Sequence, residues 1–142
     1  MSVEEFRNQF QRIIDRRGFG DDKYIDSNEE REIVKDCVDI GIPLESAQAV
    51  LLEVCRKRGY VLETNLMKKV NASLQASLGD DGKIDQEEFG EAVAICVQEA
   101  RGRVDEAYCK RLVIRMIERG EAPVKTGFFS DWFKKIKKEV GA

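Results

Sequence analysis

The sequence GDDKYIDSNE at residues 20–29 is repeated, with changes, as GDDGKIDQEE at residues 79–88, which is 59 positions further on (79 − 20). Glycine, two aspartates, isoleucine, a third aspartate and a glutamate recur at the same offsets. Each copy lies between two segments of helical periodicity and leads into the second of them. Two copies predict a duplicated helical unit, because a solenoid needs at least about three repeats.

Apolar residues recur at spacings of three and four along the chain, which predicts helices. We expect them over residues 2–17, 27–40, 44–58, 63–77, 86–101 and 104–119. Glycines or prolines follow most of these segments, as they do at helix ends, and no stretch alternates for long enough to predict a sheet. The sequence therefore predicts an all-α fold, a single compact helical bundle of six to seven helices with internal pseudo-duplication. We expect the domain over residues 1–120, a linker over 121–127 and a C-terminal amphipathic helix over 128–140.

Composition excludes several classes of function. The net charge of −3 argues against a nucleic-acid binder, which carries a basic footprint. Histidine is absent, so Ser-His-Asp and Cys-His nucleophiles are excluded. No phosphate-binding loop or dinucleotide fingerprint is present, and we expect a protein that is not an enzyme.

Cysteine usage and hydropathy predict a cytoplasmic protein. The cysteines at positions 37, 55, 96 and 109 form no CxxC pair, and each lies in an apolar helical stripe. We interpret them as small buried thiols, with redox or metal chemistry as the alternative. The N-terminus has no apolar signal-peptide region, and no apolar run approaches the ~18 residues of a membrane span.

The acidic loops have two interpretations. In the first, they bind a divalent cation, Ca²⁺ or else Mg²⁺, because such hard ions take several oxygen ligands. Gly82 fits the turn glycine of an EF-hand loop, although Ser77 and Gly79 stand where that motif has aspartates. The candidate ligands are Asp80, Asp81, Asp85 and Glu88 in the second loop and Asp22, Asp26 and Glu29 in the first.

In the second interpretation, the same carboxylates cap helices. Asp26 with Glu29, and Asp85 with Glu88, have the spacing of a capping box, in which each side chain accepts a backbone N–H from the other residue. Acidic side chains in a first helical turn also complement the helix dipole. Capping accounts for the pattern without a metal, and the two interpretations are compatible.

The two turns also carry a family resemblance. A helix, an acidic D-G-x-I-x-x-x-E turn, a helix and a second such turn resemble the tellurite-resistance TerB-like family. The matching residues are Asp22, Ile25, Glu29 and Ile33 in one half and Asp81, Gly82, Lys83, Ile84, Glu88 and Val93 in the other. The resemblance covers residues 2–119, and Lys23 departs from it where the second turn has glycine.

What the resemblance implies is an all-helical bundle whose acidic residues form a metal-binding surface. It further implies a non-catalytic module of stress-response or regulatory complexes, some of them linked to membranes. The residues that match the family's acidic positions are Asp22, Asp26, Glu29, Asp81, Asp85 and Glu88.

The C-terminal segment predicts a basic amphipathic helix. Phe129, Trp132, Phe133 and Ile136 share one helical face, and lysines that include Lys134 and Lys138 lie largely on the other. Such a helix either folds back onto its own bundle or docks on a partner protein or an anionic membrane surface. A protein partner is expected in the second case, with peripheral membrane contact as the alternative.

Overall fold

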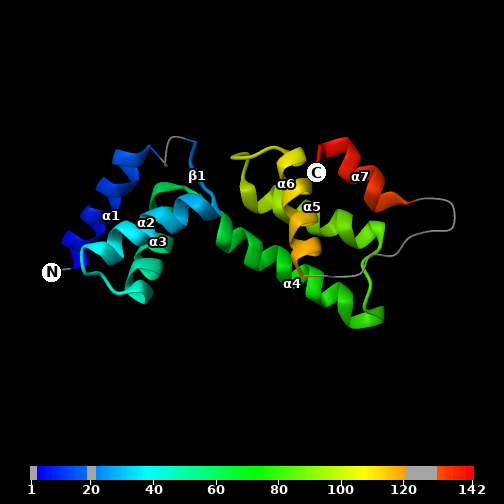
Figure 1. Ribbon diagram of the computed structural model, residues 1–142, viewed down its shortest axis with the longest axis horizontal. Coiled ribbons are helices and arrows are strands. Elements are labelled where there is room, and N and C mark those ends of the chain that lie inside the picture. Colours follow the sequence, from blue (N-terminus) through cyan, green and yellow to red (C-terminus); the bar gives the residue numbers. More distant parts are fainter. Residues whose placement is uncertain (1–2, 19–21, 121–130) are drawn as a thin grey trace. The chain divides into compact units, whose positions relative to one another are not determined.

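A computed structural model describes the backbone of residues 3–18, 22–120 and 131–142, and their side chains except at positions 3, 6 and 79–81 (Figure 1). This part of the chain contains seven helices and two short strands. They are α1 Val3–Arg17, β1 Tyr24–Ile25, α2 Ser27–Asp39, α3 Leu44–Arg58, β2 Val61–Leu62, α4 Glu63–Asp81, α5 Gln86–Ala100, α6 Glu106–Arg119 and α7 Trp132–Val140. The all-α prediction is confirmed.

The chain divides into two compact units, residues 1–65 and 66–142. The boundary lies inside α4, whereas the sequence analysis placed its boundary near residue 120. The first unit contains α1, α2 and α3, which pack on one another, and the second contains α5, α6 and α7. Each unit therefore has its own packed helices.

Apolar side chains of three helices form the core of the first unit. Phe10 and Ile14 of α1 meet Ile33 of α2 and Leu51 of α3, and all four are fully buried. Burial of this kind contributes about 1.5–3 kcal/mol for each large side chain. The helical periodicity in the sequence thus marks the faces that the helices bury.

A parallel pair of two-residue strands joins the first acidic loop to the chain before α4. Tyr24 pairs with Val61 and Ile25 with Leu62, and the Val61 amide donates to the Lys23 carbonyl at 2.9 Å. The sequence analysis predicted no sheet, because two residues are too few to show alternation. The pairing holds the first acidic loop against the first unit.

Helix α4 is longer than predicted. We expected it to stop at Gly79, but it continues to Asp81, and Gly82 then turns into the left-handed region with φ 73°. A glycine inside a helix costs only about 1 kcal/mol relative to alanine, so Gly79 does not end it. The Gly82 amide donates to the Leu78 carbonyl at 2.9 Å and closes the helix.

Helix α7 is shorter than predicted. It begins at Trp132, because Asp131 has φ −98° and ψ 74°, outside the helical region. The expected helical residues 128–130, and the expected linker over 121–127, lie outside the described residues.

Candidate functional site

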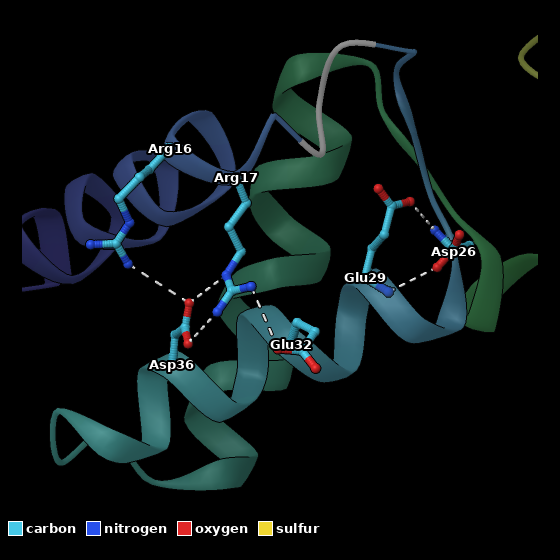
Figure 2. A network of polar contacts seen from close by, with 6 residues as sticks. All are labelled: Arg16, Arg17, Asp26, Glu29, Glu32 and Asp36. Atoms are coloured by element: carbon cyan, nitrogen blue, oxygen red, sulfur yellow. Dashed lines mark hydrogen bonds and ion pairs between the residues drawn. The ribbon is translucent and has the colours of Figure 1, made fainter.

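Both acidic loops end in the same capping box. The Asp26 carboxylate accepts the Glu29 amide at 2.8 Å, and the Glu29 carboxylate accepts the Asp26 amide at 3.0 Å (Figure 2). The second loop repeats this arrangement between Asp85 and Glu88 with the same two distances. The capping prediction is confirmed in both copies.

The backbone before each box is also repeated. Lys23 and Gly82, 59 positions apart (82 − 23), are both left-handed, with φ 57° and 73°. In each copy the second residue after that turn is a fully buried isoleucine, Ile25 or Ile84. The buried isoleucine anchors the loop, and the box that follows starts the next helix.

The third carboxylate of the first loop also bonds to the backbone. An oxygen of Asp22 accepts the Tyr24 amide at 3.0 Å, which stabilises the turn around Lys23. Partial burial raises the pKa of Glu29, and the nearby carboxylates of Asp26 and Asp22 raise it further. The backbone hydrogen bond from Asp26 opposes that rise. The hydrogen bond from the Asp26 amide therefore offsets only part of the rise in the Glu29 pKa that burial and the neighbouring carboxylates cause.

A cation needs oxygens that converge from several residues. Among the described side chains, no group of three or more Asp, Glu or Cys residues could hold a metal ion. Asp22, Asp26 and Glu29 are all described, so their carboxylates do not form such a group. Asp85 and Glu88 are described as well, whereas the side chains of Asp80 and Asp81 lie outside the described residues.

The backbone of the second loop differs from an EF-hand loop. In that motif the first ligands come from positions 1, 3 and 5, which here are residues 77, 79 and 81. These residues belong to helix α4, which ends at Asp81. A bound cation would thus have to use Asp85 and Glu88 with oxygens from the end of a helix.

Sequence reasoning missed a buried glutamate at the start of α4. Glu63 is only 4% exposed. Its carboxylate accepts the Tyr24 hydroxyl at 2.5 Å and the Ser27 hydroxyl at 3.1 Å. These bonds tie the first loop and the start of α2 to the residue that follows β2. The only sequence signal is a charged residue directly after an apolar pair.

An ion pair joins the end of α1 to α2 (Figure 2). Arg17 donates from Nε to Oδ2 of Asp36 at 2.7 Å and from Nη2 to Oδ1 at 2.8 Å. This two-point contact lowers the pKa of Asp36 and raises that of Arg17. Two further charged residues approach this pair. Nη2 of Arg16 lies 3.8 Å from Oδ2 of Asp36, and Oε2 of Glu32 lies 3.5 Å from Nη1 of Arg17. The contact links two helices of the first unit.

Helix α7 folds back onto the second unit. Trp132 is 6% exposed, and its ring centroid lies 5.6 Å from that of Phe89 in α5. Phe133 meets the same Phe89 ring edge-on at 6.4 Å. In the structure, the C-terminal helix therefore packs on its own unit, as the fold-back interpretation expects.

Polar contacts hold the other side of α7. Lys137 pairs with Glu118 of α6 at 2.9 Å, and Arg111 donates to the Val140 carbonyl at 3.2 Å. Among the predicted docking residues, Ile136 is half-buried and Lys134 and Lys138 are exposed, while Phe129 lies outside the described residues.

An exposed apolar corner between α2 and α3 was also missed. Val38, Ile40 and Leu44 are 45%, 53% and 51% exposed, and Gly41 between them has φ 93° with open space where a Cβ would stand. Their spacing matches that of the core positions, so the sequence pattern does not distinguish them from buried residues. We refer to Val38, Ile40 and Leu44 as the apolar corner.

Comparisons with protein-family models, curated proteins and solved structures find no match. The TerB-like resemblance accordingly depends on the motifs of the two acidic turns. None of the described helices is both long and apolar enough to cross a membrane.

All four cysteines are free and buried, as the sequence predicts. Burial raises the pKa of Cys37 to about 11 and that of Cys55 to about 12. Such thiols are almost wholly protonated at neutral pH, and the protonated form is a poor nucleophile and metal ligand.

Proposed function

We propose that the chain is a non-enzymatic helical binding module that docks a protein partner at the apolar corner. This function accords with the non-catalytic role that the TerB-like resemblance implies. The observation that carries it is the exposure of Val38, Ile40 and Leu44 at one turn of the first unit. Exposed apolar side chains that gather on a surface are typical of protein-binding sites, and these three lie within seven consecutive residues of the chain.

Charge around the corner favours a partner with basic flanks. Asp39 and Glu45 are exposed beside the apolar residues. A partner helix with an apolar stripe between lysines or arginines would cover the apolar corner with its stripe and pair its basic side chains with Asp39 and Glu45. Complementary charge of this kind raises the association rate and selects the partner more than it adds affinity.

The competing surfaces offer less to a partner. The apolar face of α7 is occupied by its own unit through Trp132 and Phe133. The carboxylates of Asp26, Glu29, Asp85 and Glu88 serve the capping boxes. The apolar corner is therefore the surface that best supports binding.

The proposal is tested by quantitative affinity capture from cells that naturally contain the protein. The double variant Ile40→Ser, Leu44→Ser removes the apolar corner, and Val97→Ser is the matched control, because Val97 of α5 is also exposed, at 42%. We expect at least one protein to be retained by the wild type and the control and lost by the double variant. With that partner purified, calorimetry should show affinity weakened by about tenfold or more.

Two outcomes would overturn the proposal. One is a set of captured proteins that the double variant retains in full. The other is a concentration-dependent dimer in sedimentation velocity that the double variant abolishes, since the corner would then bind a second copy of the chain. All changed side chains are exposed, so circular dichroism should show the same helix content in the three proteins.

A further inference from the structure

Helices α6 and α7 concentrate positive charge in the second unit. Residues 106–119 and 131–142 contain eight lysines and arginines and four acidic residues, which gives a net charge of +4 (8 − 4). The whole chain has a net charge of −3, so all its other residues together carry −7 (−3 − 4). An uneven distribution of charge of this kind indicates a surface that binds an anionic partner.

Helix α7 packs on α6 (Figure 1). Arg111 of α6 donates to the Val140 carbonyl at 3.2 Å, and Glu118 of α6 pairs with Lys137 at 2.9 Å. Arg115 lies four residues after Arg111 and three residues before Glu118, and residues at these spacings share one face of a helix. The exposed Arg115 side chain therefore lies on the side of α6 that carries both contacts with α7.

The inner and outer faces of α7 differ in character. Trp132 and Phe133 pack on α5 and mark the face that is turned toward the unit. Lys134, Lys135 and Lys138 are exposed, and on a helix of 3.6 residues per turn they fall within an arc of about 100° on the outer face. We refer to the exposed bases of the two helices as the basic surface: Arg115, Lys134, Lys135 and Lys138.

Acidic neighbours neutralise only part of this charge. Lys134 pairs with Asp131 at 3.3 Å, but its side chain is 84% exposed, and an ion pair that is so exposed to water is weak. Glu139 is also exposed on α7. The other three members of the basic surface form no ion pair with any residue that the structure describes. The basic surface therefore keeps positive charge that a partner can use.

Three of the four members of the basic surface are lysines, which favours a lipid partner. A lysine ammonium is a compact, hydrated point charge, whereas an arginine guanidinium matches the fixed geometry of a single carboxylate or phosphate. Lysines therefore suit a partner whose negative charge is spread over a plane. Clusters of about four to eight bases on an amphipathic helix are typical of proteins that bind anionic lipid headgroups.

We propose that the basic surface binds the headgroups of an anionic lipid bilayer while α7 stays packed on the second unit. The attraction is electrostatic, and each basic residue near such a bilayer strengthens binding by about fivefold. The apolar residues of α7 take no part, in contrast to an interfacial helix that inserts its apolar face. The proposal does not rest on the apolar corner, which belongs to the first unit.

The test measures sedimentation of the full chain with vesicles of phosphatidylglycerol and, in parallel, of phosphatidylcholine. We expect binding to the anionic vesicles and none to the zwitterionic ones. Binding should weaken steeply as the salt concentration rises from about 0.01 M to about 0.15 M, because the Debye length falls from about 30 Å to about 8 Å. The double variant Ile40→Ser, Leu44→Ser should bind as the wild type does.

Two triple variants separate the basic surface from the overall charge of the chain. The first replaces three exposed lysines of α7: Lys134→Gln, Lys135→Gln and Lys138→Gln. The matched control replaces three exposed bases of the first unit: Arg12→Gln, Arg31→Gln and Lys35→Gln. Both variants have the same net charge of −6 (−3 − 3). All six side chains are exposed, so circular dichroism should show the helix content of the wild type in both.

The α7 variant should lose affinity for phosphatidylglycerol vesicles by at least about tenfold. The control should bind almost as tightly as the wild type. Emission of Trp132 shows whether α7 stays packed, because this residue is 6% exposed against α5. We expect the emission maximum of the bound chain to equal that of the free chain.

Four results would refute the proposal. They are no binding to phosphatidylglycerol at low salt, equal binding to the two kinds of vesicle, equal loss of binding in the two triple variants, and a shift of Trp132 emission on binding. A duplex DNA that the wild type binds in preference to the anionic vesicles, and that the α7 variant releases, would instead assign the basic surface to nucleic acid.

Discussion

Lys23 and Gly82 take the same left-handed conformation at equivalent positions of the two acidic loops, with φ 57° and 73°. Glycine adopts this region without steric cost, whereas a residue with a Cβ loses roughly 1–2 kcal/mol there. Two further hydrogen bonds hold the first loop in this conformation: the Tyr24 amide donates to the Asp22 carboxylate, and the Val61 amide donates to the Lys23 carbonyl.

Substitutions at these two positions should change the free energy of unfolding to different extents. Gly82→Ala should lower the free energy of unfolding by about 1 kcal/mol through backbone strain, because open space surrounds the added methyl group. Lys23→Gly should change it by less than about half of that, since relief of strain is offset by the greater freedom of glycine in the unfolded chain. Urea denaturation measures both.

Gly90 provides the control for the first exchange. It lies exposed inside α5 with open space around it and no positive φ. Gly90→Ala should raise the free energy of unfolding by about 0.5–1 kcal/mol. Loss of stability at position 90, or a neutral Gly82→Ala, would contradict the role assigned to backbone conformation.

The capping boxes should stabilise both units to a similar extent. Asp26→Ala and Asp85→Ala each leave a helix-start amide without its acceptor and should lower the free energy of unfolding by about 1 kcal/mol. Asp→Asn at the same positions should cost less, because an amide oxygen also caps a helix. If alanine and asparagine cost the same in chemical denaturation, the carboxylates do not act as caps.

The sequence predicted the helices and the boxes well, because both follow from local rules. Asp26 with Glu29 and Asp85 with Glu88 show their pairing in a four-residue window. The buried Glu63 and the docking of Trp132 on Phe89 depend on partners far along the chain. No local pattern fixes those partners.

The end of α4 and the exposure of the apolar corner are two further features that local sequence patterns do not determine. Gly79 and Gly82 are both helix-stop signals, and only the backbone geometry decides that the second ends the helix. Ile40 and Leu44 match the helical apolar spacing, but each leaves about half of its surface exposed, at 53% and 51%. Apolar spacing identifies a face without saying what covers it.

Any uptake of Ca²⁺ or Mg²⁺ should be confined to the second loop. The described carboxylates of the first loop, those of Asp22, Asp26 and Glu29, do not form a group that could hold an ion. Calorimetric titration after chelation should therefore give the same heat for Asp22→Asn as for the wild type, whereas Asp85→Asn should remove whatever heat the wild type shows. Heat that Asp22→Asn abolishes would place the cation in the first loop and contradict this expectation.

Glu29 should make the first unit less stable as the pH rises. Its pKa is raised above 4.5 by burial, with smaller contributions from Asp26 and Asp22. Between 4.5 and that raised value the folded state binds more protons than the unfolded state, so stability falls with rising pH across this window. Glu29→Gln keeps an oxygen for the Asp26 amide and removes the charge. It should be more stable than the wild type above the window, with the difference vanishing below it.

Carbon-detected NMR titration of the Glu29 carboxyl checks the cause. The midpoint should lie above 4.5 in the wild type and move down in Asp22→Asn, which removes one neighbouring charge and keeps the oxygen that accepts the Tyr24 amide. A midpoint at or below 4.5 would contradict the assigned environment of Glu29.

Trp132 should report the docking of α7 directly, because it is the only tryptophan in the chain. Its burial against Phe89 predicts blue-shifted emission that vesicles of phosphatidylglycerol leave unchanged. Trp132→Ala should remove hydrogen-exchange protection from α7 and lower the free energy of unfolding of the second unit by about 3 kcal/mol. Lys138→Ala, at an exposed position of the same helix, should leave both unchanged. A vesicle-induced emission shift would show that α7 leaves its unit for a membrane surface.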